Sequence, residues 1–184
     1  MGLDITYYKL GELVEVEEGI EAYSQEFYDK YGDLLHIGEM ESYTEQTDSL
    51  DEGYYRIERL GGFRAGSYSG YSWYRTALRR LSLMVMKKNK ELSEKYDEDA
   101  FEQQLDFSDC EGIIGPFTSV ELFNTYSDFE KPIIHDIIKM AKYGVDESIY
   151  ETYSKDELGH FVALYREWKM AFEKTSRIGV VYFH

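Results

Sequence analysis

Apolar and polar positions along the chain recur with two different periods, which predict strands in some segments and helices in others. Four segments are rich in strand-forming residues or alternate with a period of two. They lie at residues 3–8, 36–44, 54–60 and 179–184. We expect Gly61 and Gly62 to break the third strand, and we expect the closing strand to pair beside the first.

Apolar residues recur at helical spacing in five further segments. They lie at residues 17–31, 71–90, 116–127, 132–143 and 154–174, and the first of them is expected to be a helix or a long turn. Pro116 fits the first position of a helix, and Ser154 with Glu157 has the form of a capping box. A glycine follows the first and the fourth of these segments and is expected to end each helix. Residues 96–104 are polar and are expected to form a connector.

The combined pattern predicts an α+β fold, with a small, mostly antiparallel sheet and four to five helices packed on it. At 184 residues and 43% hydrophobic content, a single domain over residues 1–184 is the simplest organisation. The apolar runs are much shorter than the roughly 20 residues needed to cross a bilayer, and the opening residues lack the basic region and apolar stretch that are typical of a signal peptide. We therefore expect a cytoplasmic protein with no membrane partner. The single cysteine, Cys110, excludes an internal disulfide.

Charge is divided unevenly along the chain. The formal net charge is −16, which argues against a general binder of nucleic acid, because phosphate affinity depends on lysine and arginine. Residues 12–52 hold fourteen acidic residues and one basic residue, whereas residues 56–95 hold ten basic and three acidic residues. Three interpretations stay open. The two segments pair as solvated surfaces, the basic segment receives an anionic ligand, or the acidic segment imitates nucleic acid toward a basic partner protein.

The basic segment contains the best candidate for a binding site, GFRAGSYSGY at residues 62–71. Its glycines allow a ligand to approach the backbone closely, and the start of the next helix presents unpaired N–H groups to an anion. Serine hydroxyls would hydrogen-bond a phosphate, arginines would neutralise it, and tyrosine rings would stack on a base. The residues proposed for these roles are Arg64, Ser67, Tyr68, Ser69, Tyr71, Arg75 and Arg79. In the structural alternative, Ser69 or Ser72 only caps the helix and the glycines only form a turn.

A second candidate is the segment LDFSDCEGIIGP at residues 105–116. Asp109 and Glu111 are two residues apart, so in an extended segment both carboxylates lie on one face. On that face they are candidates for three roles, which are to bind a cation, to pair with the arginines or to act as acid and base. A salt-bridged turn is the structural alternative. No metal or cofactor is expected, because the four histidines lack the spacing of a helical ligand pair.

Four short segments resemble a family of small uncharacterised proteins of bacteria and their phages. These segments are the opening MGLDI, the loop RAGSYSGY, the segment SDCEGIIGP and the closing YFH. The resemblance implies no known activity. It does imply a site formed by the loop together with Asp109, Glu111 and His184, provided that the segments meet in space. Residues 12–52 and 86–104 have no counterpart in the resemblance.

These observations favour a binding protein over an enzyme. The leading hypothesis is a phage-encoded counter-defence protein that sequesters a small anionic ligand such as a nucleotide signal in the host cytoplasm. The first alternative is an acidic DNA mimic that inhibits a basic nucleic-acid-binding host protein, as anti-CRISPR proteins do. The second is a hydrolase that uses Asp109 and Glu111. Neither the ligand-sequestering protein nor the DNA mimic would contact nucleic acid directly. The sequence leaves open whether the protein forms a homo-oligomer.

Overall fold

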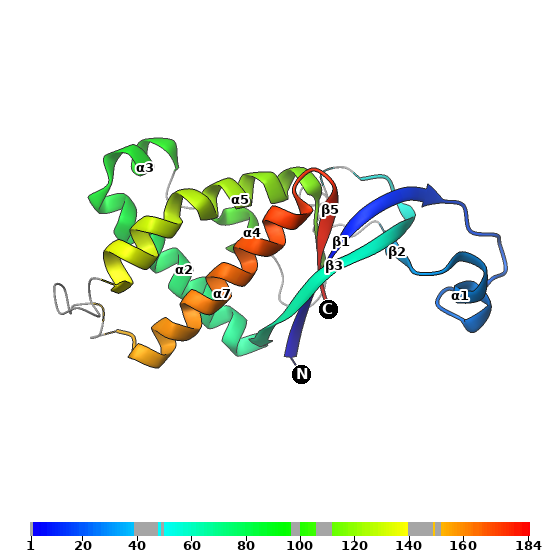
Figure 1. Ribbon diagram of the computed structural model, residues 1–184, viewed down its shortest axis with the longest axis horizontal. Coiled ribbons are helices and arrows are strands. Elements are labelled where there is room, and N and C mark those ends of the chain that lie inside the picture. The colour runs from blue at the N-terminus through cyan, green and yellow to red at the C-terminus, as the bar shows by residue number, and fades with distance from the viewer. Residues whose placement is uncertain are drawn as a thin grey trace.

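The computed structural model describes residues 2–38, 48, 50–96, 100–105, 112–139, 149 and 152–184. Five strands form one antiparallel sheet in the order β2-β3-β1-β5-β4 (Figure 1). They are β1 (Gly2–Val14), β2 (Leu34–Ile37), β3 (Gly53–Ser67), β4 (Gly112–Ile114) and β5 (Gly179–Phe183). The first and last strands are adjacent, as predicted, with Ile5 opposite Phe183 and Lys9 opposite Gly179.

Six α-helices and one π-helical segment occur in the described residues, so the predicted α+β fold is confirmed. They are α1 (Gln25–Tyr31), α2 (Tyr68–Lys88), α3 (Lys90–Lys95), α4 (Glu102–Leu105), α5 (Pro116–Glu130), the π-helix η1 (Lys131–Lys139) and α7 (Lys155–Thr175). The predicted capping box is present at Ser154 and Glu157. Figure 1 shows α1 alone at one end of the molecule, with the other helices gathered beyond the opposite side of the sheet.

The predicted end of the third strand at Gly61 and Gly62 is wrong, because β3 continues through both glycines to Ser67. Close packing explains why glycine is needed there. A Cβ at Gly61 would collide with the Tyr7 hydroxyl, and one at Gly62 would approach the Ile5 carbonyl oxygen to 2.7 Å. In this strand the glycine pair therefore marks a close approach of neighbouring groups, which is the other common meaning of glycine within a strand.

Residues 17–31, expected to form an amphipathic helix or a long turn, are helical only over α1. Gly19 and Tyr23 have φ angles of 91° and 62°, which are incompatible with a continuous right-handed helix. The helix begins only after Ser24, whose hydroxyl accepts a hydrogen bond from the N–H of Phe27. Phe27 is the one residue of α1 that is fully buried.

Three further boundaries differ from the prediction. The second strand covers residues 34–37, and most of the rest of its predicted range lies outside the described residues. The expected connector at 96–104 contains the start of α4. The predicted helix at 132–143 continues directly from α5 as η1 to Lys139, beyond which the chain is not described until Ile149.

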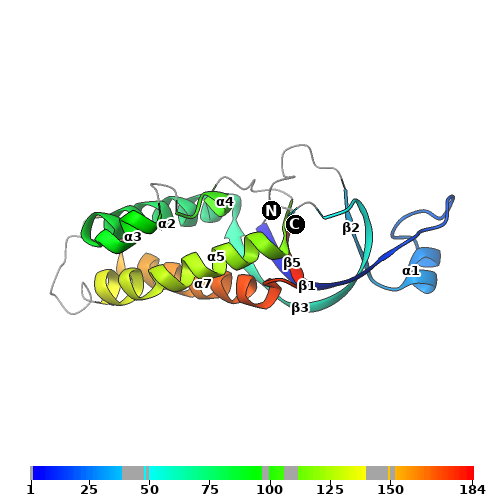
Figure 2. The same cartoon turned by 90° about the horizontal axis from the view of Figure 1, so that it is seen from above.

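The sheet separates two apolar clusters. The larger one lies between the helices and the face that carries Leu3, Ile5 and Tyr7 of β1. The smaller one includes Ile37 of β2 and Ile113 of β4. Because β2 and β4 are the two outer strands, their contact with one cluster means that the sheet curls toward this second face, here called the concave face (Figure 2).

Candidate functional site

The structure brings together the segments that carry the family resemblance. The opening of β1 pairs with the end of β3, with Gly2 opposite Ser67 and Asp4 opposite Arg64. On the other side of β1, the backbone N–H groups of Asp4 and His184 each donate to the other residue's carbonyl oxygen, at 2.8 and 3.0 Å. The described part of the third segment, from Gly112 onward, is adjacent to the fourth, because Gly112 of β4 lies opposite Phe183.

The glycine-serine turn serves chiefly to start α2. Ser67 is the N-cap, and its hydroxyl accepts a hydrogen bond from the N–H of Gly70 at 3.1 Å. The hydroxyls of Ser67 and Ser69 are 2.9 Å apart, and both residues are exposed. The structural alternative is therefore correct in kind, although the capping serine is neither Ser69 nor Ser72. Capping does not prevent the exposed Ser69 from meeting a ligand.

The aromatic residues after the turn belong largely to the core. Tyr71 is fully buried, and its ring centroid lies 5.7 Å from that of Trp168 and 6.2 Å from that of Phe183. Tyr68 is half-buried against the larger cluster. The ring of Tyr71 thus stacks inside the protein, where a ligand does not reach it.

The arginines of α2 have partners within the protein. Arg75 donates from Nη1 to the carbonyl oxygen of Leu105 at 3.0 Å, and its guanidinium lies 5.0 Å from the centre of the Tyr71 ring. Arg75 therefore holds the end of α4 against α2. Arg79 is exposed one turn further along the helix. Asp109 and Glu111 lie outside the described residues, so their proposed roles stay predictions.

Arg64 differs from the helical arginines in its surroundings. It is exposed, and its guanidinium lies over Gly2, where any side chain would collide with it. It forms no hydrogen bond or ion pair with any residue that the structure describes, and the same is true of Arg59. The guanidinium of Arg59 lies beside Gly62, where a Cβ would be 3.3 Å from its Nη2.

Arg59 and Arg64 lie on the concave face. Because Leu3, Ile5 and Tyr7 face the helices, the alternate residues of β1 face the other way. Strand pairing then defines three rows across this face. The rows are Arg64, Asp4 and His184; Gly62, Thr6 and Tyr182; and Arg59, Tyr8 and Val180. Simple alternation along β3 would place Arg59 on the same face as Gly61, toward the helices. A register shift between Tyr7 and Tyr8 instead places Arg59 on the same face as Arg64.

The imidazole of His184 is held in place on this face. Its Nε2 lies 2.9 Å from the hydroxyl of Thr6, which is 5% exposed, and its ring stacks on Tyr182 at a centroid distance of 5.2 Å. His184 itself is exposed. The face therefore presents two cations without partners in the described residues, together with an oriented imidazole. Sequence reasoning missed Arg59, Asp4 and Thr6, because only the register of the strands places them beside Arg64 and His184.

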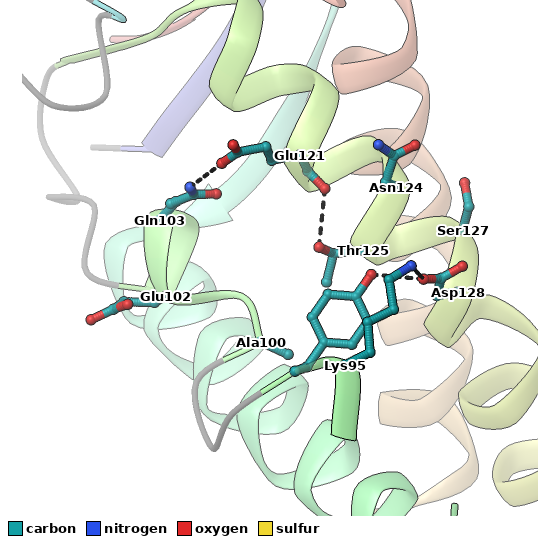
Figure 3. A pocket seen from close by; sticks show the side chains of 10 residues that line it. Lys95, Ala100, Glu102, Gln103, Glu121, Asn124, Thr125, Ser127 and Asp128 are labelled. Atoms are coloured by element: carbon teal, nitrogen blue, oxygen red, sulfur yellow. Dashed lines mark hydrogen bonds and ion pairs between the residues drawn. The ribbon is translucent and has the colours of Figure 1, made fainter. Parts of the chain in front are cut away.

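A separate polar cavity of about 530 Å³ lies between α3, α4 and α5 (Figure 3). Figure 3 shows Gln103 meeting Glu121 at one end, where Nε2 and Oε2 are 2.5 Å apart, and Lys95 meeting Asp128 at the other. Burial opposes ionisation of Asp128, but hydrogen bonds from Lys95 and Tyr96 outweigh it and lower its pKa. Since its charged groups largely satisfy one another, this cavity is the weaker candidate.

Comparison of the chain with protein-family models, with curated proteins and with solved structures finds no match. The family resemblance therefore stays a prediction. Among the described residues, no group of three or more His, Cys, Asp or Glu side chains is placed to hold a metal ion. None of the helices in the described ranges is long and apolar enough to cross a membrane.

Proposed function

We propose that this protein is a non-enzymatic binding protein that holds a small anionic ligand on the concave face of its sheet. The observation that carries the proposal is the pair of exposed guanidiniums, Arg59 and Arg64. Neither has a hydrogen-bonding or ionic partner among the described residues, although acidic residues outnumber basic ones 36 to 20 in the chain. An anionic ligand would supply the opposite charge that the described residues do not place in contact with these two groups.

The chemistry of these groups suits phosphate. A guanidinium donates two parallel hydrogen bonds to two oxygens of one phosphate, which gives it both affinity and a fixed orientation. Gly62 lies between Arg59 and Arg64 on β3 and is exposed. Thr6 would hold the imidazole of His184 at the border of this site. Encoded by a phage, such a protein would withdraw a nucleotide signal from host defence.

Titration calorimetry with linear and cyclic nucleotides and with inorganic phosphate tests this function. Replacing Arg59 and Arg64 singly with glutamine is expected to weaken binding about tenfold or more each, because hydrogen bonds to charged groups contribute about 1.5–3 kcal/mol. The matched control is Arg166→Gln, an exposed arginine of α7, which is expected to leave binding unchanged. Equal affinities in all three variants would contradict the proposal, and conversion of the ligand to a product would instead indicate the hydrolase.

A second function is favoured by a different observation. Residues 12–33, here called the acidic lobe, contain eight carboxylates, all on exposed residues, and one lysine. The lobe includes α1, which Figure 1 places far from the other helices. It also exposes Leu13, Tyr23 and Tyr28, which are 50%, 50% and 41% accessible. Exposed tyrosines among carboxylates fit a protein interface with a basic partner.

The acidic lobe can be tested independently of the arginines. Glu12 and Glu17 pair with Arg56 and Lys30, so the informative change is replacement of the remaining four lobe glutamates with glutamine. These are Glu15, Glu18, Glu21 and Glu26. In affinity capture from a bacterial lysate, we expect basic proteins to bind the wild type, to bind less as salt rises, and to be lost with the variant. Undiminished capture by the variant, or loss with Arg64→Gln instead, would exclude this function.

A further inference from the structure

A second cavity, of about 320 Å³, is lined in part by Arg59. It is lined by residues of four elements and the turn before β2, namely Tyr8, Tyr28, Asp33, Leu34, Ile57 and Arg59. Its volume is within the range of small-molecule sites, which begins at about 300 Å³. None of these residues belongs to the segments that suggested a site from the sequence.

The cavity exists because β2 is short. β2 pairs only with residues 53–56 of β3, so Ile57 and Arg59 lie just beyond the end of that ladder. Helix α1 lies over this gap and is anchored from two sides. The Tyr31 carbonyl oxygen accepts from Arg56 Nη1 at 3.1 Å, and the Tyr31 hydroxyl accepts from the N–H of Glu17 at 3.0 Å. The wall that carries Tyr28 is therefore fixed to the sheet.

The lining suits a planar aromatic ring. Tyr8 comes from the sheet and Tyr28 from the helix, and both offer aromatic surface for stacking. Leu34 and Ile57 add apolar contacts, while the exposed carboxylate of Asp33 accepts hydrogen bonds from N–H groups at the edge of a ring. This combination of aromatic faces with one acceptor is the kind that holds a nucleobase.

Arg59 connects this cavity to the anion site. It lines the cavity and lies opposite Tyr8 in one row of the concave face, and its guanidinium lies beside Gly62, which belongs to the next row toward Arg64. A ligand whose ring lay against Tyr8 and Tyr28 would thus carry its anionic group toward Arg59 and Arg64. A free phosphate would contact Arg59 and Arg64 but would not fill the part of the cavity between Tyr8 and Tyr28.

We propose that the ligand is bipartite, with a nucleobase-like ring in the cavity formed by Tyr8, Tyr28, Asp33 and Ile57 and a phosphate held by Arg59 and Arg64. This inference rests on the proposed function, and it assigns the ligand to the mononucleotide class rather than to anions in general. It also assigns Tyr28 as a residue that determines ring affinity without affecting the phosphate.

Calorimetry with three probes separates the two ends of the site. The probes are adenosine 5′-monophosphate, uridine 5′-monophosphate and inorganic phosphate. We expect at least one nucleotide to bind tenfold or more tightly than phosphate. Tyr28→Ala is expected to weaken that nucleotide about tenfold while leaving phosphate unchanged, and Tyr28→Phe, which keeps the ring, is expected to retain the affinity. Tyr28 is 41% exposed, so its replacement is not expected to affect folding.

The outcomes distinguish the inference from the function on which it rests. If phosphate binds and depends on Arg59 and Arg64, but neither nucleotide binds more tightly, the ring site is overturned and the anion site stands. The same holds if Tyr28→Ala leaves nucleotide affinity unchanged. If neither phosphate nor nucleotide binds to the wild type, the proposed function fails and the ring site with it.

Discussion

Replacing Trp168 with alanine is expected to lower the free energy of unfolding by about 3–5 kcal/mol, the range for truncation of a buried tryptophan. Trp168 is fully buried at the centre of the larger cluster. Its ring lies 5.1 Å from Phe63 of β3, 5.7 Å from Tyr71 of α2 and 5.3 Å from Phe183 of β5, measured between ring centroids. Removing it would therefore loosen the contact of α7 with three other elements. Urea denaturation followed by circular dichroism measures the change.

Trp168→Phe is the matched control for this truncation. The indole Nε1 of Trp168 is buried and has no hydrogen-bond partner among the described residues. Phenylalanine would lose some packing but would also remove this unsatisfied donor, so we expect a much smaller cost than for alanine. Equal losses in the two variants, or an alanine variant within 1 kcal/mol of the wild type, would show that Trp168 does not have the central position described.

The second large effect is expected at alkaline pH. Burial raises the pKa of Tyr74, Tyr126 and Tyr165 well above the ordinary value of 10. The Tyr74 and Tyr126 hydroxyls are 3.0 Å apart, and Tyr126 donates to Gln104 Oε1 at 2.6 Å. Tyr165 donates to the Tyr126 carbonyl oxygen at 2.6 Å. The hydroxyls of all three tyrosines therefore stay protonated in the folded state.

The sign of the pH dependence follows from proton linkage. The unfolded state loses tyrosine protons from about pH 10 upward, while the folded state keeps them, so these three tyrosines leave stability unchanged below pH 10 and lower it above that pH. Each buried tyrosine contributes a slope of about 1.4 kcal/mol per pH unit. Urea denaturation at pH 8, 10 and 11 measures this fall. Tyr74→Phe should make the slope shallower, and a slope that is the same in wild type and Tyr74→Phe would refute the linkage.

Local signals in the sequence predicted the fold class and several helix boundaries correctly. The capping box at Ser154 and Glu157 is such a signal, because its two hydrogen bonds join residues only three positions apart. Pro116 likewise begins α5 as expected. The cap of that helix could not be predicted, however. Gly115 has no side chain to offer, and Asp48, about 70 residues away, accepts hydrogen bonds from the N–H groups of Phe117 and Thr118.

The candidate site was predicted only in part, for a related reason. Of the residues predicted in the loop at 62–71, Arg64 lies on the proposed face. The sequence offered no reason to prefer Arg64 over Arg75 as a ligand-binding residue. Arg75 donates a hydrogen bond to the carbonyl oxygen of Leu105, and only the tertiary fold brings these two groups together. Nor did it connect Arg59 with Arg64. Their common face depends on a register shift within the β1–β3 pair, which no local pattern encodes.

The most direct test of the anion site is a crystal structure of the wild-type protein soaked in tungstate, an anion that mimics phosphate and scatters anomalously. The account predicts an anomalous peak on the concave face beside Gly62, within hydrogen-bonding distance of Arg59 or Arg64. It also predicts that this peak disappears in the Arg59→Gln, Arg64→Gln double variant. A peak elsewhere on the molecule with none at this face, or an unchanged peak in the double variant, would contradict it.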